Sequence, residues 1–269
     1  MKLTPTDAIT TLFLGLFMTI QCDRSSAQAF DLASATQNLA PRTYLKAAIY
    51  TGNFLLVTGK DPDGKPTGIA PDLAKALGAR LGVNVELIPF ATQNEVIEAT
   101  ASSDCDIGLV GADPARAENV IFTTAYVEIE ATYMVTNKSP YQNATELDSE
   151  SVRIGAKDKS AYELWLSRNL KHAKLIKTKT VDEAIALLNK NELDAVAGLR
   201  PGLIEDLSKA SDGQLLNGRF MAVQQAIATR KANPQAAVFL QQFIEEAKSS
   251  GLISRIIKEH QVSGLTIPN

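Results

Sequence analysis

Hydrophobic and polar positions alternate with two different periods along the first part of the chain. Residues 44–50 alternate like a strand, and leucines at every fourth position predict a helix over residues 71–82. Alternation returns over residues 83–88, residues 94–101 have a helical pattern, and residues 106–110 form the apolar run of a buried parallel strand. This part of the chain therefore predicts strand, helix, strand, helix, strand.

The same order of elements repeats in the second part of the chain. Two helical segments begin with an S/T-x-x-E capping box, one at Ser160 and one at Thr180. They separate three strand-like segments, residues 152–156, 174–177 and 194–198. Two such units predict an α/β fold with two lobes, each a mostly parallel sheet flanked by helices.

Two further strand-like segments predict connections between the lobes. Residues 131–136 lie between the two repeats and residues 221–230 follow the second one, so we interpret them as two hinge crossings. The first lobe then takes residues 44–136 plus 224–269, and the second lobe takes residues 137–223. Outside the lobes, the polar leader before residue 44 has no predicted element.

The first 29 residues have the order of a secretory signal peptide. A mostly apolar stretch over residues 8–20 precedes Ala27-Gln28-Ala29, a small-x-small cleavage pattern. The stretch is shorter than the about 20 residues that a membrane span needs, and an N-terminal anchor helix is the alternative. Cleavage would remove Cys22, whose preceding residues disfavour lipidation. Cys105 would then be the remaining cysteine, and we expect it to be a buried hydrophobe.

The composition mainly excludes certain classes of binding partner. The 269 residues are 45% hydrophobic and 21% charged, which is ordinary for a globular protein. The net charge of −3 and the absence of a run of basic residues argue against a nucleic acid or an anionic membrane as partner.

The residues that follow the predicted strands share a chemistry. In open α/β sheets, ligands bind at the carboxyl ends of the strands. Small polar groups, an aromatic ring and several cations occur there: Asn53 and Phe54; Gly111, Ala112 and Arg116; Lys157, Lys159 and Ser160; and Arg200. Ser160 begins a helix, and Asp113 would cap another if Pro114 is its first residue. Cations and helix N-termini that converge in an acidic chain predict a site for an anionic small molecule.

Each of these residues also has a simpler interpretation. The alternative for Arg116 is a surface arginine paired with Asp113 or Glu118. The two lysines are then solvated, Arg200 covers a helix start, and Phe54 belongs to the core. Only the convergence of these residues favours a binding site.

Patterns for catalysis are missing from the sequence. It contains no histidine–carboxylate constellation, no Cys/His spacing for a metal, no G-x-S-x-G and no phosphate-binding loop. Glu128 and Glu130 alternate on one face of a strand, and we interpret them as a polar face rather than an acid–base pair. We therefore predict a protein that is not an enzyme and that uses no metal or cofactor.

Three blocks of the sequence resemble the bacterial extracellular solute-binding proteins of family 3, the polar amino-acid-binding components of ABC importers. PTGIAPDLAKALGARLGVNVELIPF resembles the family's G-F-D-x-D-L-A block, DPARAENVIFTTAY its T-P-E-R-x-x-x-V-x-F block, and NKNELDAVAG its G-x-x-D-A-V segment. The likeness runs over most of residues 44–260, and the first two blocks together are quite specific.

The resemblance implies a hinged, type II periplasmic-binding-protein-like fold whose cleft closes on a ligand. It implies that Arg116 clamps the carboxylate of the ligand, that Phe54 covers the ligand, and that backbone N–H groups at Ser160 reach the same carboxylate. It also implies a periplasmic monomer that captures a carboxylate-bearing amino acid or organic acid for the membrane permease of an ABC transporter.

Two departures from the family pattern change the expected ligand. The segment before Arg116 is shorter than in the family, and Ala112 lacks the usual hydroxyl group. Gly198-Leu199-Arg200 lacks the aspartate that often binds the α-ammonium group. We therefore expect a small anionic or zwitterionic ligand that has carboxylate character at both ends, or an organic acid that lacks the amine. An acidic amino acid is included if Glu128 or Glu130 replaces that aspartate. A cyclohexadienyl-dehydratase-like enzyme and a secreted accessory or sensory module are the alternative functions on this fold.

Replacing Arg116 with alanine tests the expected carboxylate clamp. We expect the unliganded fold to stay stable and the ligand-induced rise in Tm to disappear, because that rise requires binding to the native state. Thermal unfolding with a panel of amino acids and dicarboxylates measures both effects. A variant that responds as fully as the parent would refute the clamp, and tight binding of lysine, arginine or histidine would contradict an anionic ligand.

Overall fold

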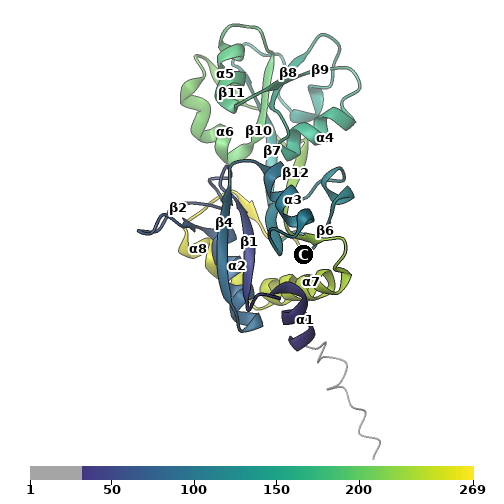
Figure 1. Cartoon of the computed structure of the whole chain (residues 1–269). Helices are drawn as coiled ribbons and strands as arrows, with labels where there is room; N and C mark the ends of the chain where they lie inside the picture. The colour runs from purple at the N-terminus through teal and green to yellow at the C-terminus, as the bar shows by residue number, and fades with distance from the viewer. Residues whose placement is uncertain (1–31) are drawn as a thin grey trace, which may run out of the picture. The chain divides into compact units, whose positions relative to one another are not determined.

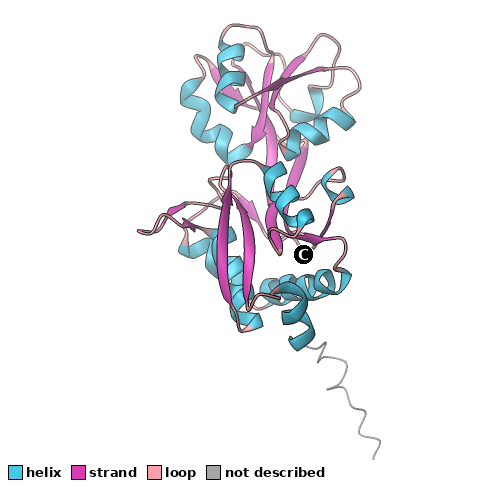
Figure 2. Cartoon of the chain, viewed as in Figure 1, coloured by secondary structure: helices cyan, strands magenta, loops and turns pink. Residues whose placement is uncertain are grey.

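The computed structural model describes residues 32–269. The predicted signal peptide over residues 1–29 lies outside the described residues. In the described part, one large mixed sheet has the strand order β4-β1-β5-β12-β7-β10-β8-β9 (Figure 1). Helices lie on both sides of its strands (Figure 2). The predicted α/β class is confirmed.

The first half of the sheet follows the predicted strand–helix order. Its three parallel strands are β1 (Tyr44–Tyr50), β4 (Asn84–Phe90) and β5 (Ile107–Gly111). They are connected by α2 (Ile69–Leu81) and α3 (Gln93–Ser102). Thr92 and Glu95 form a reciprocal capping box at the start of α3, which explains where that helix begins.

The second half repeats this order. Its parallel strands β8 (Arg153–Lys157), β9 (Lys174–Thr178) and β10 (Ala195–Leu199) alternate with α4 (Ala161–Asn169) and α5 (Val181–Asn189). Ser160 and Thr180 cap the two helices, as predicted, by accepting hydrogen bonds from the backbone N–H groups three residues later. The glutamate of each expected capping box, however, accepts from the residue before the cap.

Two ten-residue strands join the halves. Residues 127–131 of β7 (Val127–Thr136) pair with β12 (Met221–Arg230), and residues 131–135 pair with β10. β12 in turn pairs antiparallel with β5. These strands are the two predicted crossings. Since β7 contributes to both halves, the exact bounds of the two lobes stay a prediction.

The structure adds elements that the hydrophobic pattern did not show. The expectation that the leader before residue 44 lacks an element is wrong, because α1 (Leu32–Leu39) packs on α7 through the buried Ala35 and Leu39. The other additions are short: α6 (Arg200–Asp206), β2 (Gly59–Lys60), β3 (Pro66–Thr67), β6 (Val120–Phe122), β11 (Gly213–Leu215) and β13 (Leu265–Thr266). The expected C-terminal helices are α7 (Pro234–Ser249) and α8 (Leu252–Glu259).

Alternate strand positions pack against different helices. In β10, Ala195 and Ala197 belong to a cluster with α4, whereas Val196 packs with α5 on the other face. In β1, Leu45, Ala47 and Ile49 pack with α1, α2, α7 and α8, whereas Ala48 packs with α3. Helices on both faces explain why the parallel strands are nearly continuous apolar runs.

Cys105 is 2% exposed, which confirms that it is a buried hydrophobe. Burial raises the pKa of its thiol to about 11, so the sulfur is protonated near neutral pH. Across residues 32–269, no helix has the length and apolar character needed to cross a membrane.

The ion pair between Asp194 and Arg153 predicts a pH-dependent stability. Asp194 accepts hydrogen bonds from Arg153 N and Nε at 2.7 and 2.9 Å, and the Arg153 side chain holds the pKa of this carboxyl group below its usual value. A lowered pKa in the folded state adds stability above the unfolded pKa near 4, and the contribution is lost as the pH falls through the folded value.

We therefore expect Asp194→Asn to lower Tm at pH 7 and to match the parent protein near pH 2. Thermal unfolding across this range measures the difference. Asp63→Asn is the control, since Asp63 is exposed and accepts no side-chain hydrogen bond within residues 32–269. A difference in Tm between Asp194→Asn and the parent protein that does not change with pH would contradict the ion-pair explanation.

Candidate ligand-binding site

A cavity of about 120 Å³ lies where the strand ends of the two halves meet. The first half contributes the residues after β1 and the start of α3. The second half contributes the start of α4 and the first turns of α6, and β12 completes the wall. Its lining residues are Tyr50, Gly52, Asn53, Phe54, Gln93, Lys157, Ser160, Ala161, Tyr162, Val181, Gly198, Leu199, Gly202, Leu203, Asp206, Val223 and Gln225. We refer to this space as the ligand cavity.

The loop after β1 places an aromatic ring at the ligand cavity. Asn53 is 7% exposed, and its side-chain oxygen accepts a hydrogen bond from the backbone N–H of Leu55 at 3.2 Å. This contact shapes the turn that carries Phe54, whose side chain remains 44% exposed. The Phe54 ring lies over Gly202 of α6, 3.4 Å from the place where a Cβ would be. Phe54 therefore contacts the opposite half of the sheet.

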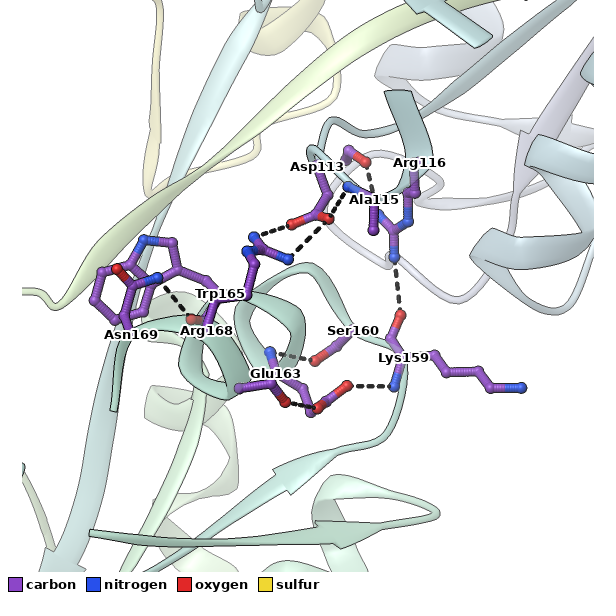
Figure 3. A network of polar contacts seen from close by, with 11 residues as sticks. Asp113, Ala115, Arg116, Lys159, Ser160, Glu163, Trp165, Arg168 and Asn169 are labelled. Atoms are coloured by element: carbon purple, nitrogen blue, oxygen red, sulfur yellow. Dashed lines mark hydrogen bonds and ion pairs between the residues drawn. The ribbon is translucent and has the colours of Figure 1, made fainter. Parts of the chain in front are cut away.

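The start of α4 is held by a buried carboxylate. Ser160 is 4% exposed, and its hydroxyl accepts from the backbone N–H of Glu163 at 3.1 Å. The Glu163 side chain has no exposed surface and accepts hydrogen bonds from Lys159 N at 2.9 Å and from the Ser167 hydroxyl at 2.5 Å. Lys177 Nζ forms an ion pair with Glu163 Oε1 at 3.0 Å. Figure 3 shows the hydrogen bonds that join Glu163 to Ser160 and Lys159.

Lys159 has a left-handed backbone conformation, with φ of 58°. This conformation is unfavourable for a residue with a side chain, so neighbouring contacts must hold it. Glu163 accepts from its N–H, and its carbonyl oxygen accepts from Arg116 Nη2 at 2.8 Å. Both the N–H and the carbonyl group of Lys159 are therefore held by hydrogen bonds (Figure 3).

Arg116 is 4% exposed and connects the halves. Its Nη1 donates to the carbonyl of Gly111 at 2.6 Å in its own half, while Nη2 donates to Lys159 in the other. The buried Nε has no partner within residues 32–269. Burial lowers the pKa of the guanidinium to about 10, and nearby Asp113 partly opposes this effect. The alternative of a surface arginine is wrong.

A second contact between the halves lies beside Arg116. The Asp113 carboxylate is 4% exposed and accepts from both terminal nitrogens of Arg168 on α4, at 3.1 and 2.5 Å. One of its oxygens also accepts from Ala115 N at 2.9 Å. Bidentate, charge-assisted hydrogen bonds of this kind are stronger and more directional than hydrogen bonds between neutral groups. The pair thus connects the loop after β5 to the second half.

The local structure around Asp113 differs from the expected helix. Asp113 accepts a capping-type hydrogen bond, but the chain forms a turn and then a 3₁₀ helix of three residues, Arg116–Glu118. So short a segment has few aligned peptide dipoles. The cationic Arg116 therefore does not face the N-terminus of an extended helix, whose dipole would repel it.

The model of the bacterial extracellular solute-binding proteins, family 3, matches residues 49–262. The chain belongs to this family. It is also similar to solved structures of amino-acid-binding proteins. One is the substrate-binding protein AbpA of Streptococcus pneumoniae Canada MDR_19A bound to L-arginine, with TM-score 0.65, 22% identity, and 83% of this chain and 97% of that one covered.

Two further structures have the same fold. A binding component of an ABC transporter from Wolinella succinogenes DSM 1740, complexed with lysine, has TM-score 0.66 and 20% identity over 81% of this chain and 95% of that one. The ancestral amino acid-binding protein AncCDT-1, a precursor of cyclohexadienyl dehydratase, has TM-score 0.64 and 22% identity over 85% of this chain and 98% of that one. These likenesses confirm the type II periplasmic-binding-protein fold.

A curated relative shares only part of its length with this solute-binding protein. The chain is 27% identical over 131 residues to the membrane-bound lytic murein transglycosylase F of Maricaulis maris (strain MCS10). The match covers 48% of this chain and 28% of that protein.

The predicted site residues of this family member fall into two groups. Asn53, Phe54 and Ser160 line the ligand cavity. Gly111, Ala112, Arg116, Lys159 and Arg200 do not line it. Arg116 and Gly111 lie behind its wall, where a Cβ on Gly111 would lie 3.4 Å from Ala161 and 3.5 Å from Arg116 Nη1. Contact of the eight residues with a ligand stays a prediction.

Arg200 lies away from the ligand cavity at the start of α6. It pairs with Glu130 at 3.0 Å and donates to the carbonyl of Gly218. Glu128 accepts from Gln224 at 2.9 Å, and neither glutamate lines the ligand cavity. In the described part of the chain, no group of three or more His, Cys, Asp or Glu side chains has a geometry that could hold a metal ion.

Several polar residues that line the cavity have no recognisable signal in the sequence. Tyr50 ends β1, and its hydroxyl group contacts Lys157 Nζ at 3.3 Å. Gln93, Tyr162 and Gln225 also line the cavity. Within residues 32–269, the only carboxylate that lines it is that of Asp206, whose side chain is 20% exposed and pairs with Lys209 at 2.6 Å. Asp206 was not expected at the site because it is the last residue of α6, well beyond the strand end at Leu199.

A double-mutant cycle tests the contact between Asp113 and Arg168. We expect Asp113→Asn and Arg168→Gln to be non-additive, with a coupling of about 0.5–3 kcal/mol in the free energy of unfolding, because Asp113 is buried. Denaturant unfolding of the two single variants and the double variant gives this value. Arg255 and Glu259, an exposed pair 3.9 Å apart on α8, serve as the control cycle, with an expected coupling of about 0.3–0.5 kcal/mol or less. Equal couplings in the two cycles would contradict a special role for the buried pair.

Proposed function

We propose that this solute-binding protein captures a small carboxylate-bearing ligand in the ligand cavity and delivers it to the permease of an ABC importer. The observation that carries this proposal is that the cavity has walls from both halves of the sheet. Closure around a ligand would bring these walls together, as in hinged binding proteins. Strand ends that converge on a cavity are also the usual ligand position in α/β folds.

The charges at the cavity support a zwitterionic ligand. Lys157 lines the cavity next to Tyr50, and Asp206 lines it from α6. A ligand carboxylate would contact the ammonium group of Lys157 and the start of α4 at Ser160. A ligand ammonium group would contact the carboxylate of Asp206, so both charges would have a partner. Asp206 would then supply the anionic group that the family pattern places after D-A-V.

The small volume of the ligand cavity favours a small ligand. This volume of about 120 Å³ is comparable to a 150 Å³ engineered cavity that binds benzene. Phe54 and Tyr162 supply apolar surface, and Asn53 and Ser160 supply polar groups. We propose that Phe54 covers the ligand.

We propose that Arg116 favours binding by holding Lys159 and by joining the halves. Arg116 does not line the ligand cavity, and two of its nitrogens already donate to carbonyl groups, which argues against a direct clamp on the carboxylate. The ligand-induced Tm shift of Arg116→Ala would be lost under either role.

The predicted signal peptide and the family support export to the periplasm. The enzyme alternative requires an acid that touches the reacting group. Glu128 and Glu130 are bonded elsewhere, and Asp158 does not line the ligand cavity. Asp206 does line it, but its carboxylate is paired with Lys209. We propose a binding protein on these grounds.

Filling the ligand cavity tests the proposed site. Gly202→Leu should abolish the ligand-induced Tm shift, because the new side chain occupies the space beneath Phe54. The unliganded Tm should not fall, since leucine in a helix is favoured over glycine by up to about 1 kcal/mol. A thermal-shift screen of L-amino acids and small organic acids, followed by calorimetry, measures both effects.

Gly202→Ala is the matched control for this experiment. Its Cβ would lie 3.4 Å from the Phe54 ring, an ordinary contact, so ligand binding should persist. If Gly202→Leu responds to ligand as the alanine variant does, the ligand does not bind in this cavity.

A further inference from the structure

A second cavity borders the ligand cavity. It measures about 510 Å³ and has walls from both halves of the sheet. The two cavities share the lining residues Tyr50, Gln93, Lys157 and Ser160, so they are adjacent. Asp206 lines only the first. We refer to the second space as the lysine cavity.

The lysine cavity has an excess of positive charge. Lys157 and Lys159 follow β8, and Lys177 and Lys179 come from the end of the neighbouring β9. Its lining acids are Asp158 and Glu183, so four cations and two anions leave a net charge of +2. The whole chain, by contrast, has a net charge of −3. A cationic pocket in an acidic protein concentrates anions.

Two of these lysines already have partners inside the protein. Lys177 pairs with the buried Glu163 at 3.0 Å and with Asp158 at 3.7 Å. Lys157 Nζ lies 3.3 Å from the Tyr50 hydroxyl oxygen. The ammonium groups of Lys159 and Lys179 have neither an ion pair nor a hydrogen bond within residues 32–269.

Lys159 is held in place by the protein before any ligand arrives. Its left-handed backbone is fixed by Glu163 on one side and by Arg116 on the other. Its side chain extends away from this network, and no contact joins its ammonium group to the residues drawn in Figure 3. A cation whose backbone is already ordered loses less conformational entropy when it binds an anion.

We propose that the lysine cavity is a second subsite, which holds an anionic group at the far end of an elongated ligand. The carboxylate or phosphate group of that ligand contacts Lys159 and Lys179, while the rest of the molecule occupies the ligand cavity. This inference rests on the proposed function, because the ligand cavity must hold the first part of the molecule.

Matched pairs of amino acids test the subsite. The probes are L-glutamate, L-2-aminoadipate and L-2-aminopimelate, each compared with its side-chain amide, which is neutral at that end. Calorimetry at low ionic strength should show that the longest acid binds roughly tenfold tighter than its amide, as expected for contacts with the two exposed lysines Lys159 and Lys179. Added salt should reduce the ratio, because it screens such contacts.

Lysine variants assign the preference to a position. In Lys159→Gln/Lys179→Gln the ratio of acid to amide affinity should fall close to one, whereas the amides should bind as before. Lys171→Gln/Lys174→Gln removes the same charge from exposed positions that line neither cavity. This control should keep the preference of the parent protein.

The outcomes separate this inference from the proposed function. If the amides bind and the acids bind no more tightly than they do, the lysine subsite is overturned and the proposed function stays intact. An advantage that persists in Lys159→Gln/Lys179→Gln would also overturn the subsite. If no acid, no amide and no compound of the wider screen binds, both the inference and the proposed function fail.

Discussion

The buried guanidinium of Arg116 is the interaction on which the rest of the site depends. It donates to Gly111 in one half of the sheet and to Lys159 in the other. A charged group that is 4% exposed must have strong partners, and carbonyl oxygens from the two halves supply them. The loops after β5 and β8 are therefore held together, and the backbone of Lys159 keeps a conformation that it would not adopt alone.

Helix starts and strand ends organise the space around this contact. Hydroxyl caps fix where α4 and α5 begin, and the buried Glu163 ties the cap of α4 to Lys159 and Lys177. The same segment forms one wall of the ligand cavity and one wall of the lysine cavity. Asp113 and Arg168 add a second connection beside it. A small set of polar contacts thus shapes both cavities.

The distribution of charge distinguishes the two cavities. The ligand cavity has one lining carboxylate, Asp206, and much apolar surface, whereas the lysine cavity is mainly cationic. A molecule that spans both would meet an anion at one end and cations at the other. Such an arrangement selects for the separation of charges in the ligand as well as for its size.

The sequence by itself determined the fold class, the family and the positions of most elements. The reason is that the spacing of apolar residues in a strand or helix is a local pattern, and the residues with that spacing form the core. It also determined that Asn53, Phe54 and Ser160 lie where strand ends meet. Only the tertiary structure decided that Arg116 is buried and bonded to carbonyls, that α1 joins the core, and that Asp206 lines the cavity. The physical reason is that burial and partners depend on segments far apart in sequence, such as Arg116 and Lys159, whose contact no local pattern records.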